Sequence, residues 1–450
     1  MMTNLTKRMS SDMSDIDIYY ASAGVGKTTQ LLNIIDQHLK AGVKPERIAF
    51  VTFTRKGAEV ARLRTSERFG IPLGKLENFR TIHSMCFHAL NKTRDGMMGD
   101  LQYLEFGREC GYSFGNLHLN WAEGIDWYET KDQRLIAAEQ LYRTNRPYCE
   151  KVLFDKVDWK DLVDYMRFYS QYKKATGYVD FTDLLEQYIA LDLEEDVDVV
   201  CLDEMQDSSL LQWQVVFKAF RNVQHMYVAG DDKQAIYQFA GASPDILINL
   251  KGTQHVLDVT YRVPEVILDY ANGIAGLIKN SHKSECKSVK KGGEVDFIVS
   301  LDELDMDLSK SWFMLARNNK FLKIYTTWCQ KNGIPYMLKG IPCFTSTDKF
   351  EYKNGSTDQW AKAKLDFARK CDEKGLFYSD PMINISTIHG VKGDEADVVV
   401  VMPDMAKSAA CQLDIDEDSE HRVFYVAVTR AKEKLYILEN QTRMFYPYLI

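Results

Sequence analysis

The chain has 450 residues, of which 45% are hydrophobic and 27% are charged, and its formal net charge is −8. These values are ordinary for a globular protein, and the length suggests two to four domains at roughly 100–200 residues each. The acidic balance excludes a uniformly basic surface, although a groove with a locally positive field remains possible.

The nine cysteines are scattered, and no Cys-x-x-Cys pair occurs. This excludes the common zinc and iron–sulfur spacings and favours free thiols in a reducing compartment. No apolar run approaches the ~18 residues of a membrane span, and the polar N-terminus lacks the apolar core of a signal peptide. We therefore expect a cytoplasmic protein, in the host cytoplasm if it is phage-encoded, with no membrane association.

The first elements in the chain form a strand–loop–helix–strand unit. Residues 16–20 (IDIYY) predict a strand, the loop ASAGVGKTT follows, residues 29–42 have apolar positions at helical spacing, and residues 48–54 predict a buried strand. This βαβ order indicates a parallel sheet. Two more apolar strands, 197–204 and 225–232, end in carboxylates, which places the acids at the sheet edge where α/β folds bind ligands.

The pattern changes twice along the rest of the chain. Residues 90–177 are helical and rich in aromatic and charged residues, which indicates an inserted helical subdomain. A second α/β pattern follows residue 262, and the polar stretch 345–380 predicts a surface excursion within it. We expect the second set of strands near 294–300, 312–318, 383–387 and 397–403, and we expect the aromatic residues of the helical insertion to be core: Trp121, Trp127, Trp159, Tyr165, Tyr169 and Tyr172.

The loop ASAGVGKTT matches the phosphate-binding pattern G-x-x-x-x-G-K-[ST], with Ala21 in the first glycine position. Gly24 and Gly26 allow backbone N–H groups to approach phosphate oxygens, Lys27 reaches the β- and γ-phosphates, and the Thr28 hydroxyl holds Mg²⁺. The following helix directs its positive end at the same phosphates. The predicted nucleotide-binding residues of this loop are Ala21, Ser22, Ala23, Gly24, Val25, Gly26, Lys27, Thr28 and Thr29.

Asp203 and Glu204 end a predicted buried strand. Alone they could be an ordinary exposed acid pair. Together with the phosphate loop they predict a second Mg²⁺ ligand, Asp203, and a base that orients the attacking water, Glu204.

A series of segments then resembles the UvrD/Rep/PcrA helicases of superfamily 1A, in the family's order. Any one segment would be a weak match, but nine in one order are highly specific. After the phosphate loop they are VTFTRKGAEVARLR (51–64), TIHSMCF (81–87), DFTDLL (180–185), DEMQDSSLLQ (203–212), GDDKQAIYQFAGA (230–242), VTYR (259–262), ISTIHGVKGDEADVVVV (385–401) and RVFYVAVTRAKEKL (422–435).

The resemblance implies an α/β fold with two RecA-like parallel-sheet P-loop domains in tandem. The ATP-binding domain (1A) would comprise 1–89 and 178–262, with a helical insertion (1B) at 90–177. The second domain (2A) would comprise 263–344 and 381–450, with 345–380 as a reduced form of the family's 2B insertion.

The resemblance also implies residue roles. Gln234 would sense the γ-phosphate, Arg262 and Arg430 would be arginine fingers, Tyr261 would stack on adenine, and Glu395 would accept a hydrogen bond from the ribose. Lys27, Asp203 and Glu204 complete the catalytic set, with ATP and Mg²⁺ as the nucleotide and the ion. The implied DNA contacts are Phe53, Thr54, Arg55, Thr81, His83, Tyr237, Phe239, Thr387 and His389.

The sequence departs from the family at several positions. No Gln precedes Gln30, although relatives carry an adenine-reading Gln before the phosphate loop, so the preference for ATP over other nucleotides is expected to be relaxed. Ala240 replaces an arginine, which would weaken the link between the γ-phosphate and DNA sites. About fifty residues separate GIPY (333–336) from TIHGVKG (387–393), too few for a full 2B domain.

The expected function is an ATP-dependent DNA helicase that translocates 3′→5′ on single-stranded DNA and unwinds duplexes in repair, replication or recombination. The expected partners are single-stranded DNA and single-strand/duplex junctions, with replication or repair proteins in addition, and the expected state is a monomer. Two alternatives stay open. One is a single-stranded DNA translocase that removes proteins or remodels recombination intermediates with little unwinding, and the other is a P-loop switch protein without DNA activity.

Overall fold

The computed structural model describes residues 16–115, 130–145 and 157–449. The chain folds into two compact units. Unit 1 comprises Met1–Leu257 with Ser281–Ser284, and unit 2 comprises Asp258–Asn280 with Glu285–Ile450. The chain thus leaves unit 1 after Leu257, slightly before the expected boundary at 262, and returns to it briefly.

Unit 1 is built on a six-stranded sheet with the order β3-β2-β4-β5-β1-β6, and every neighbouring pair is parallel. The predicted parallel sheet is therefore confirmed. The strands are β1 (Ile16–Ala21), β2 (Ile48–Thr52), β3 (Phe79–Thr81), β4 (Val199–Asp203), β5 (His225–Gly230) and β6 (Thr253–Leu257).

Both faces of this sheet are covered, which explains why its internal strands are mainly apolar. In β1, Ile16, Ile18 and Tyr20 point into one hydrophobic core and Tyr19 into the other, as the two-residue period of a strand requires. The helices of the sheet region are α2 (Lys27–Lys40), α3 (Arg55–Phe69), α4 (Ile82–Ala89), α9 (Phe181–Ala190), α10 (Leu210–Ala219) and α11 (Pro244–Ile248).

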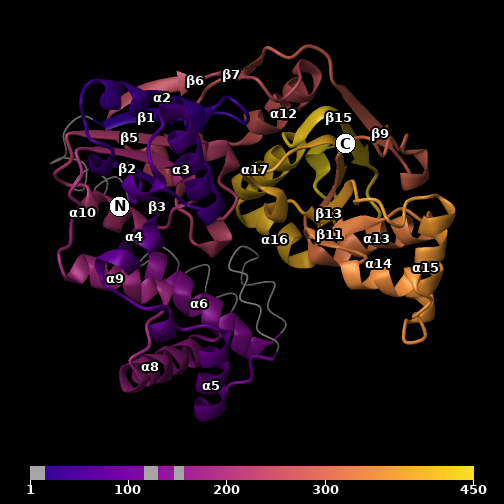
Figure 1. The fold of residues 1–450 in the computed structure, drawn as a ribbon, viewed down its shortest axis with the longest axis horizontal. Helices are drawn as coiled ribbons and strands as arrows, with labels where there is room; N and C mark the ends of the chain where they lie inside the picture. Colours follow the sequence, from indigo (N-terminus) through magenta and orange to yellow (C-terminus); the bar gives the residue numbers. More distant parts are fainter. Residues whose placement is uncertain (1–15, 116–129, 146–156, 450) are drawn as a thin grey trace. The chain divides into compact units, whose positions relative to one another are not determined.

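Three further helices of unit 1 gather apart from the sheet (Figure 1): α5 (Asp100–Cys110), α6 (Lys131–Asn145) and α8 (Trp159–Thr176). They enclose a hydrophobic core of their own, which contains Tyr165, Tyr169 and Tyr172. Trp159 packs against this core while partly exposed. The expectation that these aromatics are core is confirmed for the three tyrosines, whereas Trp121 and Trp127 lie outside the described residues.

Unit 2 contains a seven-stranded sheet with the order β12-β11-β13-β10-β14-β15-β9. All its pairs are parallel except β11 with β12. The strands are β9 (Glu294–Ile298), β10 (Trp312–Ala316), β11 (Tyr336–Leu338), β12 (Ile341–Pro342), β13 (Ile383–Thr387), β14 (Ala396–Met402) and β15 (Ala431–Leu438), while β7 (Val259–Thr260) and β8 (Lys287–Ser288) form a separate parallel pair. The helices are α12 (Glu265–Leu277), α13 (Leu322–Lys331), α14 (Ser346–Lys353), α15 (Lys362–Glu373), α16 (Lys407–Ile415) and α17 (Glu417–Val428).

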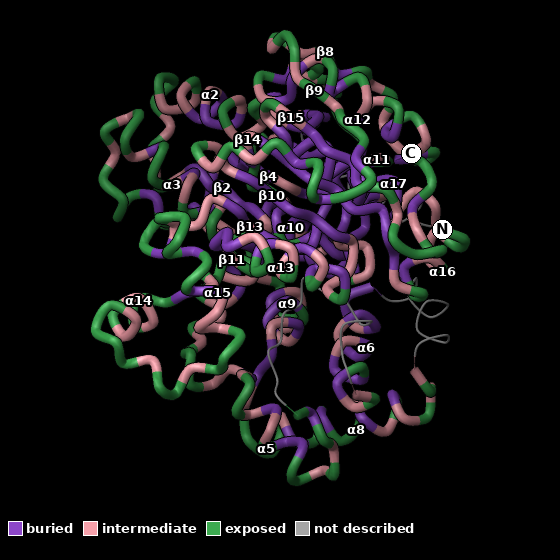
Figure 2. Tube along the Cα trace, turned by 90° about the vertical axis from the view of Figure 1, so that its right-hand side faces the viewer, coloured by how far each residue is buried: buried purple, intermediate pink, exposed green. Residues whose placement is uncertain are grey.

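The segment 345–380 divides into two parts that differ in burial (Figure 2). The helix α14 contains no buried residue, as expected of a surface excursion. In contrast, α15 buries Phe367, Ala368 and Cys371 in the core of unit 2. The expectation of a surface excursion is therefore wrong for α15, because three small or apolar residues at helical spacing give this lysine-rich helix a buried face.

None of the helices within the described ranges combines the length and the apolar composition needed to cross a membrane.

Candidate functional site

The phosphate loop lies between β1 and α2. Gly24 and Gly26 have φ angles of 73° and 83°, a left-handed conformation that glycine adopts without steric cost. Gly26 is the N-cap of α2, and it supplies no side-chain hydrogen bond to the first turn. The loop and the helix therefore present backbone N–H groups to an anion, which is the geometry that phosphate binding requires.

Lys27 stands at the first position of α2, and its Nζ lies 3.2 Å from Oε1 of Glu204. Burial disfavours the charged ammonium, but the nearby carboxylates of Glu204, Asp231 and Asp203 outweigh it and raise the pKa of Lys27. The lysine is thus held as a cation at the carboxyl edge of the sheet.

Thr28 and Asp203 form the other half of this site. The Thr28 hydroxyl donates a 2.8 Å hydrogen bond to Oδ2 of Asp203. Burial, followed by the charge of Glu204, raises the pKa of Asp203. A hydroxyl beside a carboxylate is the donor set that Mg²⁺ takes from a protein when phosphates and water supply its other ligands. The two residues therefore fit the ion that the sequence predicts.

Glu204 adopts a φ of 57°, which is unusual for a residue other than glycine. Its carboxylate accepts a hydrogen bond from Nε2 of Gln206, and Oε1 of Gln206 in turn accepts one from the backbone N–H of Asp231 at 3.1 Å. Asp231 Oδ2 accepts a 2.5 Å bond from Nε2 of Gln234. The ends of β4 and β5 are thus joined by one polar network that runs from Lys27 to Gln234.

Sequence reasoning assigned no role to Gln206 or Asp231 in this network. Gln206 is fully buried, and its amide is the bridge between the two strands. The available signal was position. Asp231 directly follows β5, Gln206 is the third residue after β4, and both strands are neighbours in the parallel sheet.

Three of the predicted DNA contacts form an aromatic group in unit 1. The ring of Phe53, which follows β2, lies 5.8 Å from that of Tyr237, and Tyr237 lies 6.1 Å from Phe239. Burial and the charge of Asp207 raise the pKa of Tyr237, so its phenol is protonated. Faces of this kind can stack on bases without sequence preference.

The other predicted DNA contacts of unit 1 have structural partners as well. Thr54 caps α3 by accepting the Gly57 N–H at 3.0 Å, and Thr81 caps α4 by accepting the Ser84 N–H at 3.2 Å. His83 packs edge-on against Phe181 at 5.5 Å, and burial together with the charge of Arg55 lowers its pKa to about 4. His83 is therefore neutral at physiological pH, and Arg55, which is exposed, carries the positive charge here.

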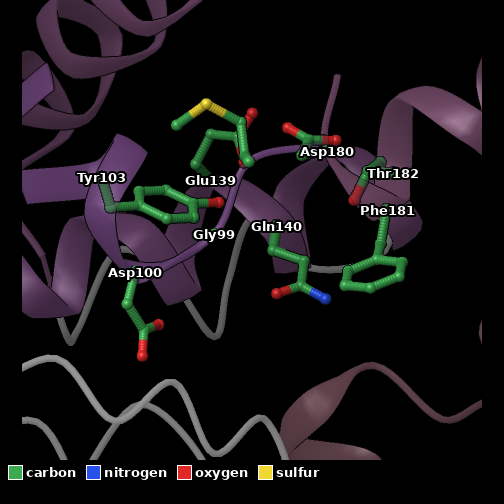
Figure 3. Close-up of a pocket in the computed structure, with 9 residues that line it drawn as sticks. Gly99, Asp100, Tyr103, Glu139, Gln140, Asp180, Phe181 and Thr182 are labelled. Atoms are coloured by element: carbon green, nitrogen blue, oxygen red, sulfur yellow. The ribbon is translucent and has the colours of Figure 1, made fainter. Parts of the chain in front are cut away.

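A cavity of about 200 Å³ adjoins these residues, between the first turns of α5 and α9 and the helix α6 (Figure 3). Its lining includes Phe181, which also contacts His83, and three carboxylic acids, Asp100, Glu139 and Asp180. The three acids make this cavity unsuitable for a phosphate group.

The predicted residues of the second domain lie in unit 2. Tyr261 is 68% exposed. Nη1 of Arg262 lies 3.6 Å from Oε2 of Glu395. Thr387 is buried, and its hydroxyl oxygen accepts the Gly390 N–H at 3.3 Å, while His389 is buried in the turn that follows β13.

Arg430 directly follows the C-cap of α17 and is 1% exposed. Its Nε donates to the carbonyl oxygen of Val426 at 2.9 Å, Nη2 donates to the Thr429 hydroxyl at 3.0 Å, and Nη1 donates to the carbonyl oxygen of Asp394 at 3.3 Å. The guanidinium is therefore held in one orientation, close to the turn that carries Glu395.

Several known proteins are similar in sequence to this chain. Among them, the probable DNA helicase II homolog of Mycoplasma capricolum subsp. capricolum is 25% identical over 67% of this chain and 44% of its own length. A probable DNA helicase of Mycoplasma pneumoniae is 22% identical over 96% of this chain and 82% of its own length. The ATP-dependent DNA helicase Rep of Escherichia coli is 24% identical over 72% of this chain and 53% of its own length.

The similarity to the helicase II homologs of Mycoplasma capricolum and Mycoplasma genitalium spans 44% and 42% of their lengths, less than half in each case. The UvrD-like helicase C-terminal domain matches residues 343–442. The UvrD/REP helicase N-terminal domain matches residues 10–255, which is more than half of the chain. The chain therefore belongs to the UvrD/Rep helicase family.

Proposed function

We propose that this chain is an ATP-dependent DNA helicase that moves 3′→5′ along single-stranded DNA and separates duplex strands ahead of it. The observation that supports the proposal most directly is the grouping of Lys27, Thr28, Asp203 and Glu204 at one sheet edge, with the hydrogen-bond network to Gln234. Such a grouping suits phosphoryl transfer to water. The membership of the chain in the UvrD/Rep family supports DNA as the substrate.

The contact between Lys27 and Glu204 suggests the first step of hydrolysis. The ammonium of Lys27 lies 3.2 Å from Oε1 of Glu204 and pairs with its carboxylate. When the ammonium turns to the β- and γ-phosphates, Glu204 loses this partner and becomes able to orient the attacking water and accept its proton. Mg²⁺ held by Thr28 and Asp203 would neutralise the phosphate oxygens. The glutamate is thus active only when the phosphates have arrived.

The remaining roles are proposed on the family resemblance and on position. Gln234 reads the γ-phosphate and passes its state to Glu204 through Asp231 and Gln206. Arg262 and Arg430 supply transition-state charge, a contribution of roughly 10³–10⁵ in kcat in enzymes that use such a finger. Tyr261 is exposed, as a stacking partner for adenine should be, and Glu395 beside Arg262 accepts from the ribose.

DNA would bind along the aromatic group of Phe53, Tyr237 and Phe239, with Arg55 neutralising a phosphate. Base stacking on aromatic rings stabilises the bound strand by about 1–3 kcal/mol for each base and tolerates any sequence. Melting costs about 1.4 kcal/mol for each base-pair step, which is a modest load for a step driven by hydrolysis. Repair, replication and recombination all present the required junctions, and the cytoplasm is the proposed location.

A duplex with single-stranded tails tests the proposal. Strand displacement with Mg²⁺ and ATP should occur on a 3′-tailed duplex, should be weak on a 5′-tailed one, and should vanish in Lys27→Ala. Displacement that prefers the 5′ tail would overturn the polarity. An ATPase that single-stranded DNA does not stimulate would overturn the motor itself and support a P-loop switch.

The second candidate is a translocase that strips proteins from single-stranded DNA and unwinds poorly. The short segment between β12 and β13 favours it, because α15 is part of the core and leaves only α14 and its turns to contact a duplex. Release of streptavidin from a biotinylated single strand, without displacement of a 3′-tailed duplex, would support this candidate over the helicase.

A further inference from the structure

A groove of about 480 Å³ lies at one end of the seven-stranded sheet of unit 2, where β12 is the last strand. Its walls come from the β11–β12 hairpin, the last turn of α13 and the first two turns of α15, which lie close together within unit 2 (Figure 1). The volume is in the range of about 300–1,000 Å³ that is usual for binding pockets. None of the residues that line the groove has been assigned to the nucleotide or to DNA.

The floor of the groove is apolar and already formed. The rings of Tyr336, Phe344 and Phe367 are buried, and the ring of Phe367 lies 4.9 Å from that of Phe344 and 5.9 Å from that of Tyr336. Nε2 of Gln330 donates a 3.0 Å hydrogen bond to the Tyr336 hydroxyl and fixes that ring. A ligand therefore meets a preformed surface, which lowers the cost of ordering the site on binding.

Two aliphatic side chains beside this floor are left exposed. Leu338 and Ile341 are directly opposite each other in the hairpin, so their side chains lie on the same face, and they are 37% and 69% exposed. Exposed apolar side chains around a hollow with a polar rim mark a surface that binds another molecule. Pro342 lacks the N–H that an added strand would need on this edge, so side chains of the ligand are expected to fill the groove.

The rim of the groove is positively charged, although the chain as a whole has a net charge of −8. Residues 320–374 contain eleven lysines and arginines against six aspartates and glutamates. Lys339 is exposed in the turn of the hairpin, and Lys362 is exposed between two alanines that line the groove. This rim is complementary to an acidic ligand and would speed its encounter with the groove.

Lys339 also holds a backbone conformation that lysine rarely adopts. Together with Gly340 it forms the two-residue turn of the hairpin, and the φ angles are 52° and 79°. Turns of this kind favour Asn-Gly, because residues other than glycine are uncommon at positive φ. The chain thus keeps a cation beside the groove at a position where asparagine would suit the turn better.

We propose that this groove binds a short segment of a partner protein in which large apolar side chains are flanked by aspartates or glutamates. The apolar side chains would pack over Phe344 and Phe367, and the acidic residues would face Lys339 and Lys362. Nucleic acid suits the groove less well, because its aliphatic walls offer no stacking faces and Lys364, the lysine among the described lining residues, already pairs with Asp348. The proposal does not depend on helicase activity.

Fluorescence anisotropy with a synthetic peptide tests the proposal. The probe is a labelled peptide with a central Leu-Phe pair flanked by aspartates, and the wild-type protein should bind it. Peptides with lysines in place of the aspartates, or with Ser-Ser in place of Leu-Phe, should bind at least about tenfold more weakly, since each lacks one half of the recognition. No binding at about 1 mM peptide, or equal binding of the three peptides, would overturn the proposal.

Variants of the hairpin locate the binding surface. Ile341→Asp should weaken binding at least about tenfold, because it places a carboxylate among apolar walls and opposite an acidic ligand. Lys339→Asn should weaken it by up to about fivefold, the effect of one exposed ion pair, while the protein melts no earlier than the wild type. Phe350→Asp is the matched control, because Phe350 is also 69% exposed but does not line the groove. Equal losses in Ile341→Asp and Phe350→Asp would contradict the assignment.

Alkylation of two cysteines shows where the peptide binds. Cys343 lines the groove and is partly exposed, whereas Cys411 is exposed on α16 and serves as the internal reference. Saturating peptide should slow the reaction of Cys343 with iodoacetamide, followed by mass spectrometry, and leave that of Cys411 unchanged. An unchanged rate at Cys343 would refute the proposal. Stronger protection of Cys343 by duplex DNA would assign the groove to DNA instead, and protection that grows with protein concentration alone would assign it to a second copy of the chain.

Discussion

Glu204 combines an unusual backbone conformation with two polar contacts, to Lys27 and Gln206. The left-handed φ directs the side chain toward the phosphate loop rather than along the exit of β4. A conformation that costs about 1–3 kcal/mol persists only where surrounding contacts enforce it, and such positions are concentrated at functional sites.

The first prediction concerns this residue. Glu204→Gln keeps the size of the side chain and can still contact Gln206, but an amide cannot accept the proton of the attacking water. We expect kcat for ATP hydrolysis to fall about 10²–10⁴-fold, the range for loss of a general base, with nucleotide affinity retained. Steady-state ATPase assays and titration with a fluorescent ATP analogue measure the two effects. A variant that keeps more than a third of wild-type kcat would remove Glu204 from the catalytic role.

The second prediction concerns Gly230, at the end of β5. A Cβ added here would lie 2.5 Å from Cδ2 of Leu247 and 2.8 Å from Oε1 of Gln206, so the bridge between β4 and β5 must move. We expect Gly230→Ala to destabilise the fold by roughly 1–3 kcal/mol, the usual cost of overpacking, and to lower ATPase activity. Urea unfolding measures the first effect.

Gly273→Ala is the matched control for that measurement. Gly273 lies within α12, where an added Cβ meets nothing within 4 Å. The substitution should stabilise the protein by about 0.5–1 kcal/mol, because alanine favours helix over glycine. Equal changes in stability for the two substitutions would show that crowding around Gly230 does not cause the destabilisation.

At the scale of elements, the helical insertion of unit 1 is joined to the sheet region by buried charges. Arg143 of α6 contacts Glu139, Asp180, Asp183 and Glu186, and Lys173 of α8 contacts Asp180 and Asp183. Asp180 is also the N-cap of α9. Since removal of one partner from such a buried group leaves unpaired charge, these three helices are expected to move together.

The third prediction follows from Glu139 in this group. Burial is the main cause that raises its pKa from 4.5 to about 7, and the charge of Asp180 adds to it. The positive charges of Arg143 and Lys173 act in the opposite direction and lower the pKa. A carboxyl group with a raised folded-state pKa stabilises the fold fully below its unfolded pKa, and this contribution is lost as the pH rises through 7.

The free energy of unfolding of the wild type should therefore decrease between pH 5 and pH 8. The corresponding decrease should be smaller in Glu139→Gln, which lacks the titrating carboxyl group. The difference is on the order of 2 kcal/mol, because one pKa unit corresponds to about 1.4 kcal/mol. Thermal unfolding of both proteins across this range measures it. Parallel pH profiles would mean that Glu139 does not titrate there.

The elements show how far the sequence alone leads. The apolar strands β1, β2, β4, β5, β9, β10, β13 and β14, the parallel pairing in unit 1 and the phosphate loop were predictable, because apolar runs and the Gly-x-Gly-Lys-Thr spacing are local signals. The short or edge strands β3, β6, β11 and β12 and the inner strand β15 were not predicted. The burial of α15 and the bridge made by Gln206 were not predicted. Both depend on partners distant in the chain, the core around β13 for α15 and Asp231 on the neighbouring strand for Gln206.

At the scale of the whole molecule, the distinguishing feature is the short stretch between β12 and β13. The larger relatives that the sequence resembles carry a mobile regulatory domain between the corresponding segments. Here α14 and α15 occupy the interval, and α15 is fixed by Phe367, Ala368 and Cys371. If the family resemblance holds for this interval, we expect the described part of the chain to lack the element that would keep it inactive until a second molecule binds.

The last prediction is therefore that single molecules are active. The strand-displacement rate per bound protein on a 3′-tailed duplex should not change with protein concentration above saturation of the tail, and one protein per tail should suffice. Single-turnover displacement, with the tail just long enough for one molecule, measures the rate, and analytical ultracentrifugation of the same complex gives the stoichiometry. A rate that climbs with the number of proteins on a longer tail would instead mean that a second copy supplies what the reduced insertion lacks, as two motors on one strand would push in series.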